Sequence, residues 1–164
     1  MIKRTAVILV LAYVLFLLEF VLYGAFGPWG KPELLVLLFV FFNLYLGIRY
    51  SIIAALAAGL LRDAFSASPF GTYIFVYVLA AYWTTFVRKY FYQPGSRFSR
   101  ALVAFFVVLA CFLIEACLHL MEHQVRFDEA LMYVLLPQLV ITMLVATVVF
   151  HRLRDVCVFF SLKS

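Results

Sequence analysis

Residues 34–61 read LLVLLFVFFNLYLGIRYSIIAALAAGLL, and this stretch decides how many helices the chain contains. It is long for one membrane span and short for two, because about 20 helical residues cross a bilayer core of roughly 30 Å. Gly47 and Arg49 interrupt it near its middle. Read as one helix, it leaves Arg49 near the centre of the membrane. Read as two helices, 34–48 and 50–65, it places Arg49 near a short turn at the membrane surface.

The composition of the whole chain indicates that most of its surface contacts lipid. Of 164 residues, 68% are hydrophobic and 13% are charged, whereas a soluble domain has about 45–50% apolar and about 25% charged residues. So few charges cannot cover a surface of this size in water. The composition therefore excludes a disordered tail, a disulfide scaffold and an ordinary cytosolic enzyme.

The apolar residues come in blocks that are too long for barrel strands, and none of the blocks alternates strictly between apolar and polar residues. The sequence therefore predicts an all-α integral membrane protein, a single transmembrane domain over residues 1–164. The approximate helices are 5–24, 34–48, 50–65, 70–87, 100–121 and 130–150.

The basic residues favour six helices with both termini in the cytoplasm, because short cytoplasmic loops are enriched in Lys and Arg. In that arrangement ten basic residues lie inside, and only Lys31, Arg62 and Arg126 lie outside. The inner set is Lys3, Arg4, Arg49, Arg88, Lys89, Arg97, Arg100, Arg152, Arg154 and Lys163. Five helices would divide the remaining charges at best eight to four. The net charge of +5 thus needs no nucleic acid partner.

Four of the inner charges, Arg88, Lys89, Arg97 and Arg100, flank a turn at residues 93–96. Such a loop would lie against anionic lipid headgroups. It could serve only to fix the topology, or it could also be a docking site for a cytoplasmic partner.

Ionisable residues inside a membrane are costly and by default suggest function. Glu19 and Glu115 lie within predicted helices, and His119 follows Glu115 by one helical turn. Arg62 and Asp63 lie at the outer end of the third helix. If these helices adjoin, the side chains form a shallow polar site that faces outward. The alternative is that Glu19 and Glu115 only hydrogen-bond between helices and hold the bundle together.

Residues 119–123, HLMEH, match the H-x-x-E-H pattern of inverted zinc peptidases. The match lies where the fifth helix leaves the membrane, where polar residues are expected anyway, and the chain lacks the soluble fold that such a site needs. We interpret it as a chance match. Since no phosphate loop or nucleophile elbow is present either, the sequence predicts no enzyme, no metal and no cofactor.

Small residues mark the third helix as a packing element. Ser51, Ala55 and Gly59 are four residues apart, and this spacing lets helix backbones approach closely. In the sixth block Pro137 is expected to kink the helix.

Residues 59–71, GLLRDAFSASPFG, form the most informative segment. It ends a small-residue helix with a charge pair and turns into the next span. Ser66 or Ser68 can cap the following helix, and Pro69 suits its first turn. Asp63 is expected either to pair with Arg62 or to cap a helix locally.

This segment resembles the MreD family of rod shape-determining proteins, whose members carry a Gly-(x)-Leu-Leu-x-Asp stretch and then Ser-x-x-Pro-x-Gly between the third and fourth helices. The matching residues here are Gly59, Leu60, Leu61, Asp63, Ser66, Pro69 and Gly71. Pro32 and Glu33 at the start of the second helix also resemble the family, with Glu where Asp is common.

The resemblance implies an inner-membrane subunit of the bacterial elongation complex that binds the bitopic protein MreC. Through MreC it implies links to RodA, to the elongation penicillin-binding transpeptidase and to MreB filaments, and so to peptidoglycan synthesis and cell shape. The fold it implies resembles the substrate-binding subunits of energy-coupling-factor transporters, and no catalytic residue comes with it. The alternative function is therefore a vitamin-binding subunit of such a transporter.

Overall fold

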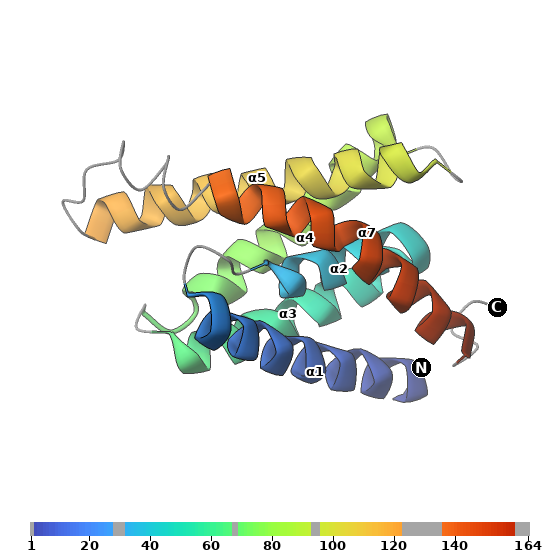
Figure 1. Ribbon diagram of the computed structural model, residues 1–164, viewed down its shortest axis with the longest axis horizontal. Helices are drawn as coiled ribbons and strands as arrows, with labels where there is room; N and C mark the ends of the chain where they lie inside the picture. The colour runs from blue at the N-terminus through green and yellow to red at the C-terminus, as the bar shows by residue number, and fades with distance from the viewer. Residues whose placement is uncertain (1, 28–31, 67–68, 93–95, 123–135, 160–164) are drawn as a thin grey trace.

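The computed structural model describes residues 2–27, 32–66, 69–92, 96–122 and 136–159. Within these residues the chain forms six helices and no strand (Figure 1). The helices are α1 (Ile2–Phe26), α2 (Leu34–Leu46), α3 (Ile48–Phe65), α4 (Thr72–Phe91), α5 (Arg97–Glu122) and α7 (Leu136–Phe159). The prediction of an all-α protein is confirmed.

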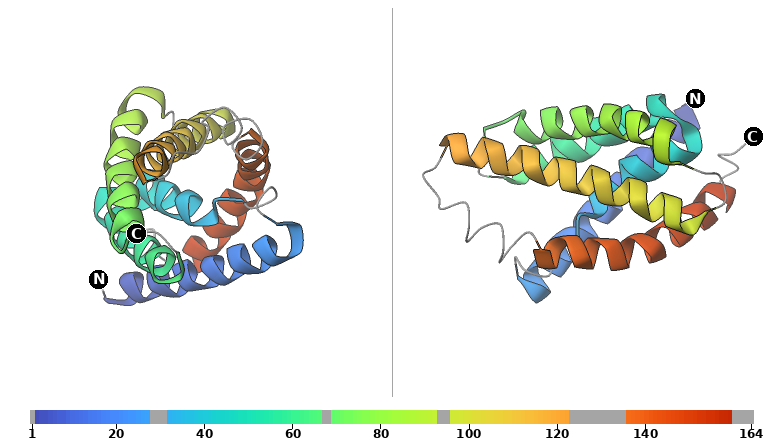
Figure 2. Two further views of the ribbon diagram at one scale, coloured as in Figure 1. Left: turned by 90° about the vertical axis from the view of Figure 1, so that its left-hand side faces the viewer. Right: turned by 90° about the horizontal axis from the view of Figure 1, so that it is seen from above.

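Helix α2 lies at the centre of the bundle. Every residue from Leu34 to Leu44 is buried, and α2 contacts each of the other five described helices. Figure 2 shows α2, in cyan, enclosed by the others in the left-hand view. A helix that is apolar on all sides requires such an environment. The enclosure also explains how α2 can be only 13 residues long, which is about 20 Å at 1.5 Å per residue.

The long apolar stretch breaks into two helices at Gly47, as predicted. Gly47 has a φ of +94°, a left-handed conformation that favours glycine. Its N–H donates to the carbonyl of Phe42 at 3.0 Å and ends α2. Helix α3 starts at the next residue, Ile48, so α2 and α3 form a tight hairpin.

The two faces of helix α1 differ in burial and hardly in polarity. Ile8, Ala12, Leu15 and Glu19 are buried, whereas most of the residues between them are large, apolar and exposed. The exposed set on α1 is Leu9, Val10, Tyr13, Val14, Leu17, Leu18, Phe20, Val21 and Tyr23. Soluble proteins rarely expose so continuous an apolar surface, so this face is suited to lipid.

Among the described helices, Lys3–Ala25 is long and apolar enough to cross a membrane by length and composition, and Leu34–Leu46 and Phe98–Ile114 are shorter apolar helices. These features are consistent with a helical membrane protein. Insertion of all six helices and the cytoplasmic position of both termini stay predictions.

The basic segments gather at one end of the bundle. The start of α1, the α2–α3 junction, the end of α4, the start of α5 and the end of α7 all lie toward the right in Figure 1. The sequence analysis assigns most of the Lys and Arg residues to these segments. We refer to this end as the basic end and to the other as the opposite end.

Helix α7 differs from the predicted sixth helix. It begins at Leu136 and continues to Phe159, beyond the predicted end at 150, whereas residues 130–135 lie outside the described residues. Pro137 is the second residue of the described part of α7, and the expected kink at this proline stays a prediction.

Candidate functional site

A largely buried arginine forms the centre of the candidate site. Arg62 lies in the last turn of α3, and its side chain is only 12% exposed. Its two terminal nitrogens bind both carboxylate oxygens of Glu33, at 2.5 and 2.9 Å. One of these nitrogens also lies 3.1 Å from Oε1 of Glu19 on α1. The guanidinium thus holds two carboxylates that are themselves buried.

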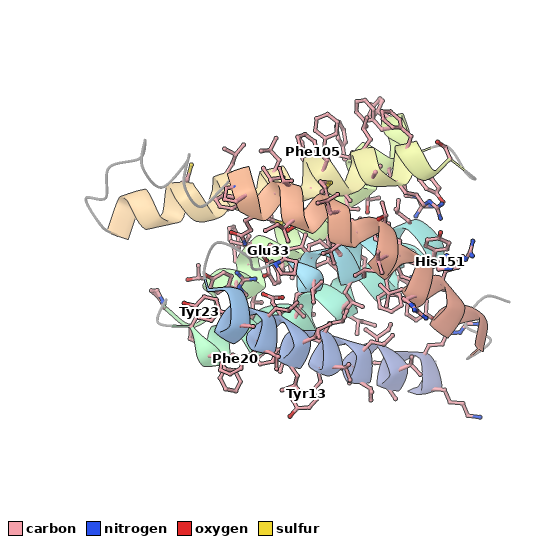
Figure 3. The ribbon with its side chains drawn as sticks, viewed as in Figure 1. Tyr13, Phe20, Tyr23, Glu33, Phe105 and His151 are labelled. Carbon is pink, nitrogen blue, oxygen red and sulfur yellow. The ribbon has the colours of Figure 1, made fainter. Side chains whose placement is uncertain are left out.

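Glu33 extends the cluster to α7. The Gln138 side-chain amide donates to Oε1 of Glu33 at 2.6 Å, and the Glu33 backbone N–H donates to the Thr142 hydroxyl at 3.1 Å. Thr142 in turn donates to the Gln138 carbonyl. Figure 3 shows Glu33 in the interior of the bundle, between α1 and α7. The start of α2 is therefore fixed to the start of α7 and to the end of α3.

Two tyrosines from α4 complete the surroundings of Arg62. The Tyr77 hydroxyl accepts from Arg62 at 2.7 Å and is itself buried. The guanidinium carbon lies 4.9 Å from the ring centre of Tyr73, which is cation–π distance. Helices α1, α3, α4 and α7 and the residue directly before α2 thus contribute side chains to what we call the Arg62 cluster: Glu19, Glu33, Arg62, Tyr73, Tyr77, Gln138 and Thr142.

The Arg62 cluster borders a pocket of about 320 Å³ between α1, α3 and α4. Glu19 and Arg62 line it together with Phe16, Phe20, Tyr23, Phe65, Ser66 and Tyr73. The rings of Phe16 and Phe65 are 5.1 Å apart. Figure 3 shows Phe20 and Tyr23 at the end of α1 that lies away from its N-terminus. The pocket combines an ionic floor with an aromatic rim, a composition typical of binding sites.

Asp63, the neighbour of Arg62, has a different role. Its carboxylate accepts the backbone N–H groups of Gly71, Tyr73 and Ile74 at 3.1, 2.9 and 3.1 Å. These N–H groups lie at the start of α4 and would otherwise have no helical acceptor. Asp63 therefore caps α4 from across the turn and does not pair with Arg62.

The cap by Asp63 differs from the expectation that Ser66 or Ser68 caps the fourth helix. Ser66 ends α3 in an extended conformation, and Ser68 lies outside the described residues. Residue 71, directly before α4, has a φ of +102°, which only glycine adopts readily. The Pro69 carbonyl accepts both the N–H and the hydroxyl of Thr72 and closes the turn.

Gly59 lies one helical turn before Asp63 on α3 and, like Asp63, faces α4. A Cβ atom at Gly59 would lie 2.6 Å from the Cα of Ile74 and 2.9 Å from its N, so only glycine permits this approach. Ser51 and Ala55 on α3 are also fully buried. The Ser51 hydroxyl donates to the carbonyl of Phe39 at 2.9 Å and joins α3 to α2.

The structure brings together Glu19 and Arg62 from the predicted outward-facing polar site. Asp63 points to the start of α4 instead. The side chains of Glu115 and His119 lie outside the described residues, as does the H-x-x-E-H match at residues 119–123. Within the described part of the chain, no group of three His, Cys, Asp or Glu residues is arranged to hold a metal ion.

Glu33 is the main carboxylate of the site, but the sequence alone did not single it out, nor Tyr73, Tyr77, Gln138 and Thr142 beside it. In the sequence Glu33 stands out only as part of the Pro32–Glu33 pair that resembles the MreD family. The burial of Glu33 could have been predicted from its position directly before a helix that has no polar face. Such a helix is buried on all sides, so the residue next to its start is buried as well.

Comparison with protein families identifies the family of the chain. A family model described as rod shape-determining protein MreD matches residues 2–158. No curated protein and no solved structure matches the chain. Since the match covers nearly the whole of the 164 residues, the chain belongs to the MreD family of rod shape-determining proteins.

Proposed function

We propose that this chain is a non-catalytic membrane subunit of the bacterial elongation complex. It binds MreC and helps to position peptidoglycan synthesis, so that the cell keeps a rod shape. The observation that carries this proposal is the match of residues 2–158 to a family of rod shape-determining proteins. RodA, the elongation penicillin-binding transpeptidase and MreB are indirect partners through MreC.

The proposed location is the cytoplasmic membrane, crossed six times with both termini inside. MreD proteins are membrane proteins, and the exposed surface of α1 and α4 is apolar and aromatic. The basic end of the bundle then lies on the cytoplasmic side, and the pocket beside the Arg62 cluster lies toward the outer side.

The pocket between α1, α3 and α4 is the proposed contact for the outer part of MreC. Phe20 and Phe65 on its rim are 62% and 70% exposed, and exposed aromatic residues around a polar pocket are common anchors in protein interfaces. The Arg62 cluster behind the pocket fixes three of the helices that shape it. A rigid pocket loses less entropy when a partner binds.

Photocrosslinking in membranes tests both the partner and the face. A photoreactive residue replaces Phe20 or Phe65 on the pocket rim, and Phe105 on α5 or Leu144 on α7 serves as an exposed control away from it. The proposal expects MreC to crosslink at the rim positions and to co-purify with the tagged chain in mild detergent. A tagged chain that retains no MreC contradicts the function. Retention of MreC with crosslinks only at the controls contradicts the assigned face.

A small-molecule binding subunit of a vitamin transporter is the second candidate, favoured by the pocket itself. Its volume of about 320 Å³ is at the lower end of the roughly 300–1,000 Å³ found for ligand sites. A ligand that binds the folded state must raise its apparent stability. The transporter function therefore expects a vitamin panel to raise the melting temperature of the purified chain. The scaffold function expects no such rise.

A further inference from the structure

A second pocket lies at the basic end, between α5 and α7. Its volume is about 630 Å³. Three arginines, Arg100, Arg152 and Arg154, line it together with His151. Figure 3 shows His151 on the later half of α7, toward the basic end. Among the described residues that line this pocket none is acidic, so this part of the lining carries a formal charge of +3.

Two of these arginines have no acidic partner in the described part of the chain. Arg100 donates to the hydroxyl of Tyr45, a neutral group. Arg152 is exposed, and no described carboxylate is within ion-pairing distance of it. Arg100 also lies in the first turn of α5, where the helix dipole adds positive potential. These features select an anion, and arginine binds phosphate oxygens with paired N–H groups.

Apart from Thr147, the other described residues that line the pocket are apolar. Ala101, Ala146, Val148 and Phe150 line it beside the arginines. Val148 lies one turn before Arg152, and Leu144 and Val140 precede it by one and two further turns. All three are more than half exposed. An apolar track along α7 thus leads to a cationic pocket, and this combination fits a molecule with a phosphate head and an acyl tail.

We propose that this pocket binds the phosphate of an anionic membrane phospholipid, whose acyl chain lies along the exposed face of α7. The proposal rests on the membrane placement given above, but not on MreC. Basic pockets between helices on the cytoplasmic side are a known mode of headgroup binding. A lipid held between α5 and α7 would join two helices that meet along only part of their length (Figure 2).

Lipid binding to the purified full-length chain tests the proposal. Native mass spectrometry from detergent measures the apparent Kd for phosphatidylglycerol, with phosphatidylcholine of the same acyl chains as the neutral comparison. The test variant is Arg100→Gln with Arg152→Gln. The matched control is Arg49→Gln with Lys89→Gln, which removes the same charge from two exposed residues at the basic end but outside the pocket.

We expect the test variant to bind phosphatidylglycerol at least about tenfold more weakly, while the control stays within about threefold of the unmodified chain. Equal losses in both variants would mean diffuse attraction to the charged surface and would overturn the proposal. No loss in either variant would overturn it as well. Because Arg100 contacts Tyr45, Arg152→Gln alone is also measured. It is exposed and should weaken binding without a change in melting temperature.

A separate arm distinguishes a lipid from free phosphate. Inorganic phosphate at millimolar concentration should leave phosphatidylglycerol bound, because it lacks the acyl chain. Displacement at such a concentration would overturn the lipid assignment. None of these measurements involves MreC, so their failure is distinct from failure of the proposed function: the test variant should still co-purify with MreC.

Discussion

Arg62 is expected to contribute strongly to the stability of the bundle. It neutralises two buried carboxylates, Glu19 and Glu33. Removal of one partner from a buried ion pair typically costs about 3–5 kcal/mol, because the remaining charge stays buried. We therefore expect Arg62→Met to lower the free energy of unfolding by about 3–5 kcal/mol, as measured by denaturation of the purified chain in detergent.

Arg49 offers a matched control for Arg62. It is exposed and lies at the opposite end of the same helix, so Arg49→Met should change stability by less than about 0.5 kcal/mol. Arg62→Lys keeps the charge but loses the paired hydrogen bonds to Glu33, so its stability should lie between those of the other two variants. An Arg62→Met protein as stable as the unmodified chain would contradict this account of the site.

Asp63 is expected to matter through the start of α4. Asp63→Ala removes the acceptor of three backbone N–H groups, and loss of a helix cap typically costs about 0.5–2 kcal/mol. Because α4 carries Tyr73 and Tyr77 into the Arg62 cluster, the variant should also retain less MreC during co-purification and impair rod shape. Asp63→Asn keeps one acceptor oxygen and should be less affected. Full stability, complex recovery and normal shape in Asp63→Ala would contradict the prediction.

At the scale of elements, the contact between α3 and α4 depends on Gly59. A methyl group there would meet the backbone of Ile74 at 2.6 Å, and backbone atoms cannot move aside as a flexible side chain can. Overpacking of this kind typically costs about 1–3 kcal/mol. Helix propensity alone would instead favour alanine over glycine by about 1 kcal/mol. We expect Gly59→Ala to destabilise the protein, with a lower melting temperature.

Gly24 provides the control, because it lies in α1 and a Cβ atom there would meet nothing within 4 Å. Gly24→Ala should be neutral or slightly stabilising, since only helix propensity acts. The two substitutions are chemically identical, but their effects on the melting temperature should have opposite signs. Destabilisation of the same size in both would show that close packing at Gly59 is not the cause.

The break at Gly47 could be predicted from the sequence, because Gly47 and Arg49 interrupt a long apolar stretch and an arginine is costly in the middle of a membrane. The central position of α2 could not. Lipid tails are as apolar as leucine, so the side of a helix that faces lipid and the side that faces protein look alike in sequence. The 3.6-residue pattern that reveals the buried face of a soluble helix is therefore weak in α1 and α2.

At the scale of the whole molecule, the same limit applies to the candidate site. The Arg62 cluster joins residues as far apart as Glu19 and Thr142, and the tertiary packing of the helices brings them together. The sequence analysis could list Glu19 and Arg62 because charges in apolar helices stand out. Glu33, Tyr77 and Gln138 do not stand out in the sequence, because residues of these types are also common at a membrane surface or a helix interface.

The orientation of the molecule gives the last prediction. If the basic end is cytoplasmic, Lys89 at the end of α4 lies inside and Phe70 before its start lies outside. Both residues are exposed, so a cysteine at either position should react equally well in detergent. In a chain with Cys111→Ala, Cys117→Ser and Cys157→Ser, a membrane-impermeant maleimide should label Phe70→Cys in spheroplasts. It should label Lys89→Cys only after the membrane is permeabilised. The reverse pattern would invert the topology, and with it the cytoplasmic location of the proposed lipid pocket and the outer location of the pocket beside Arg62.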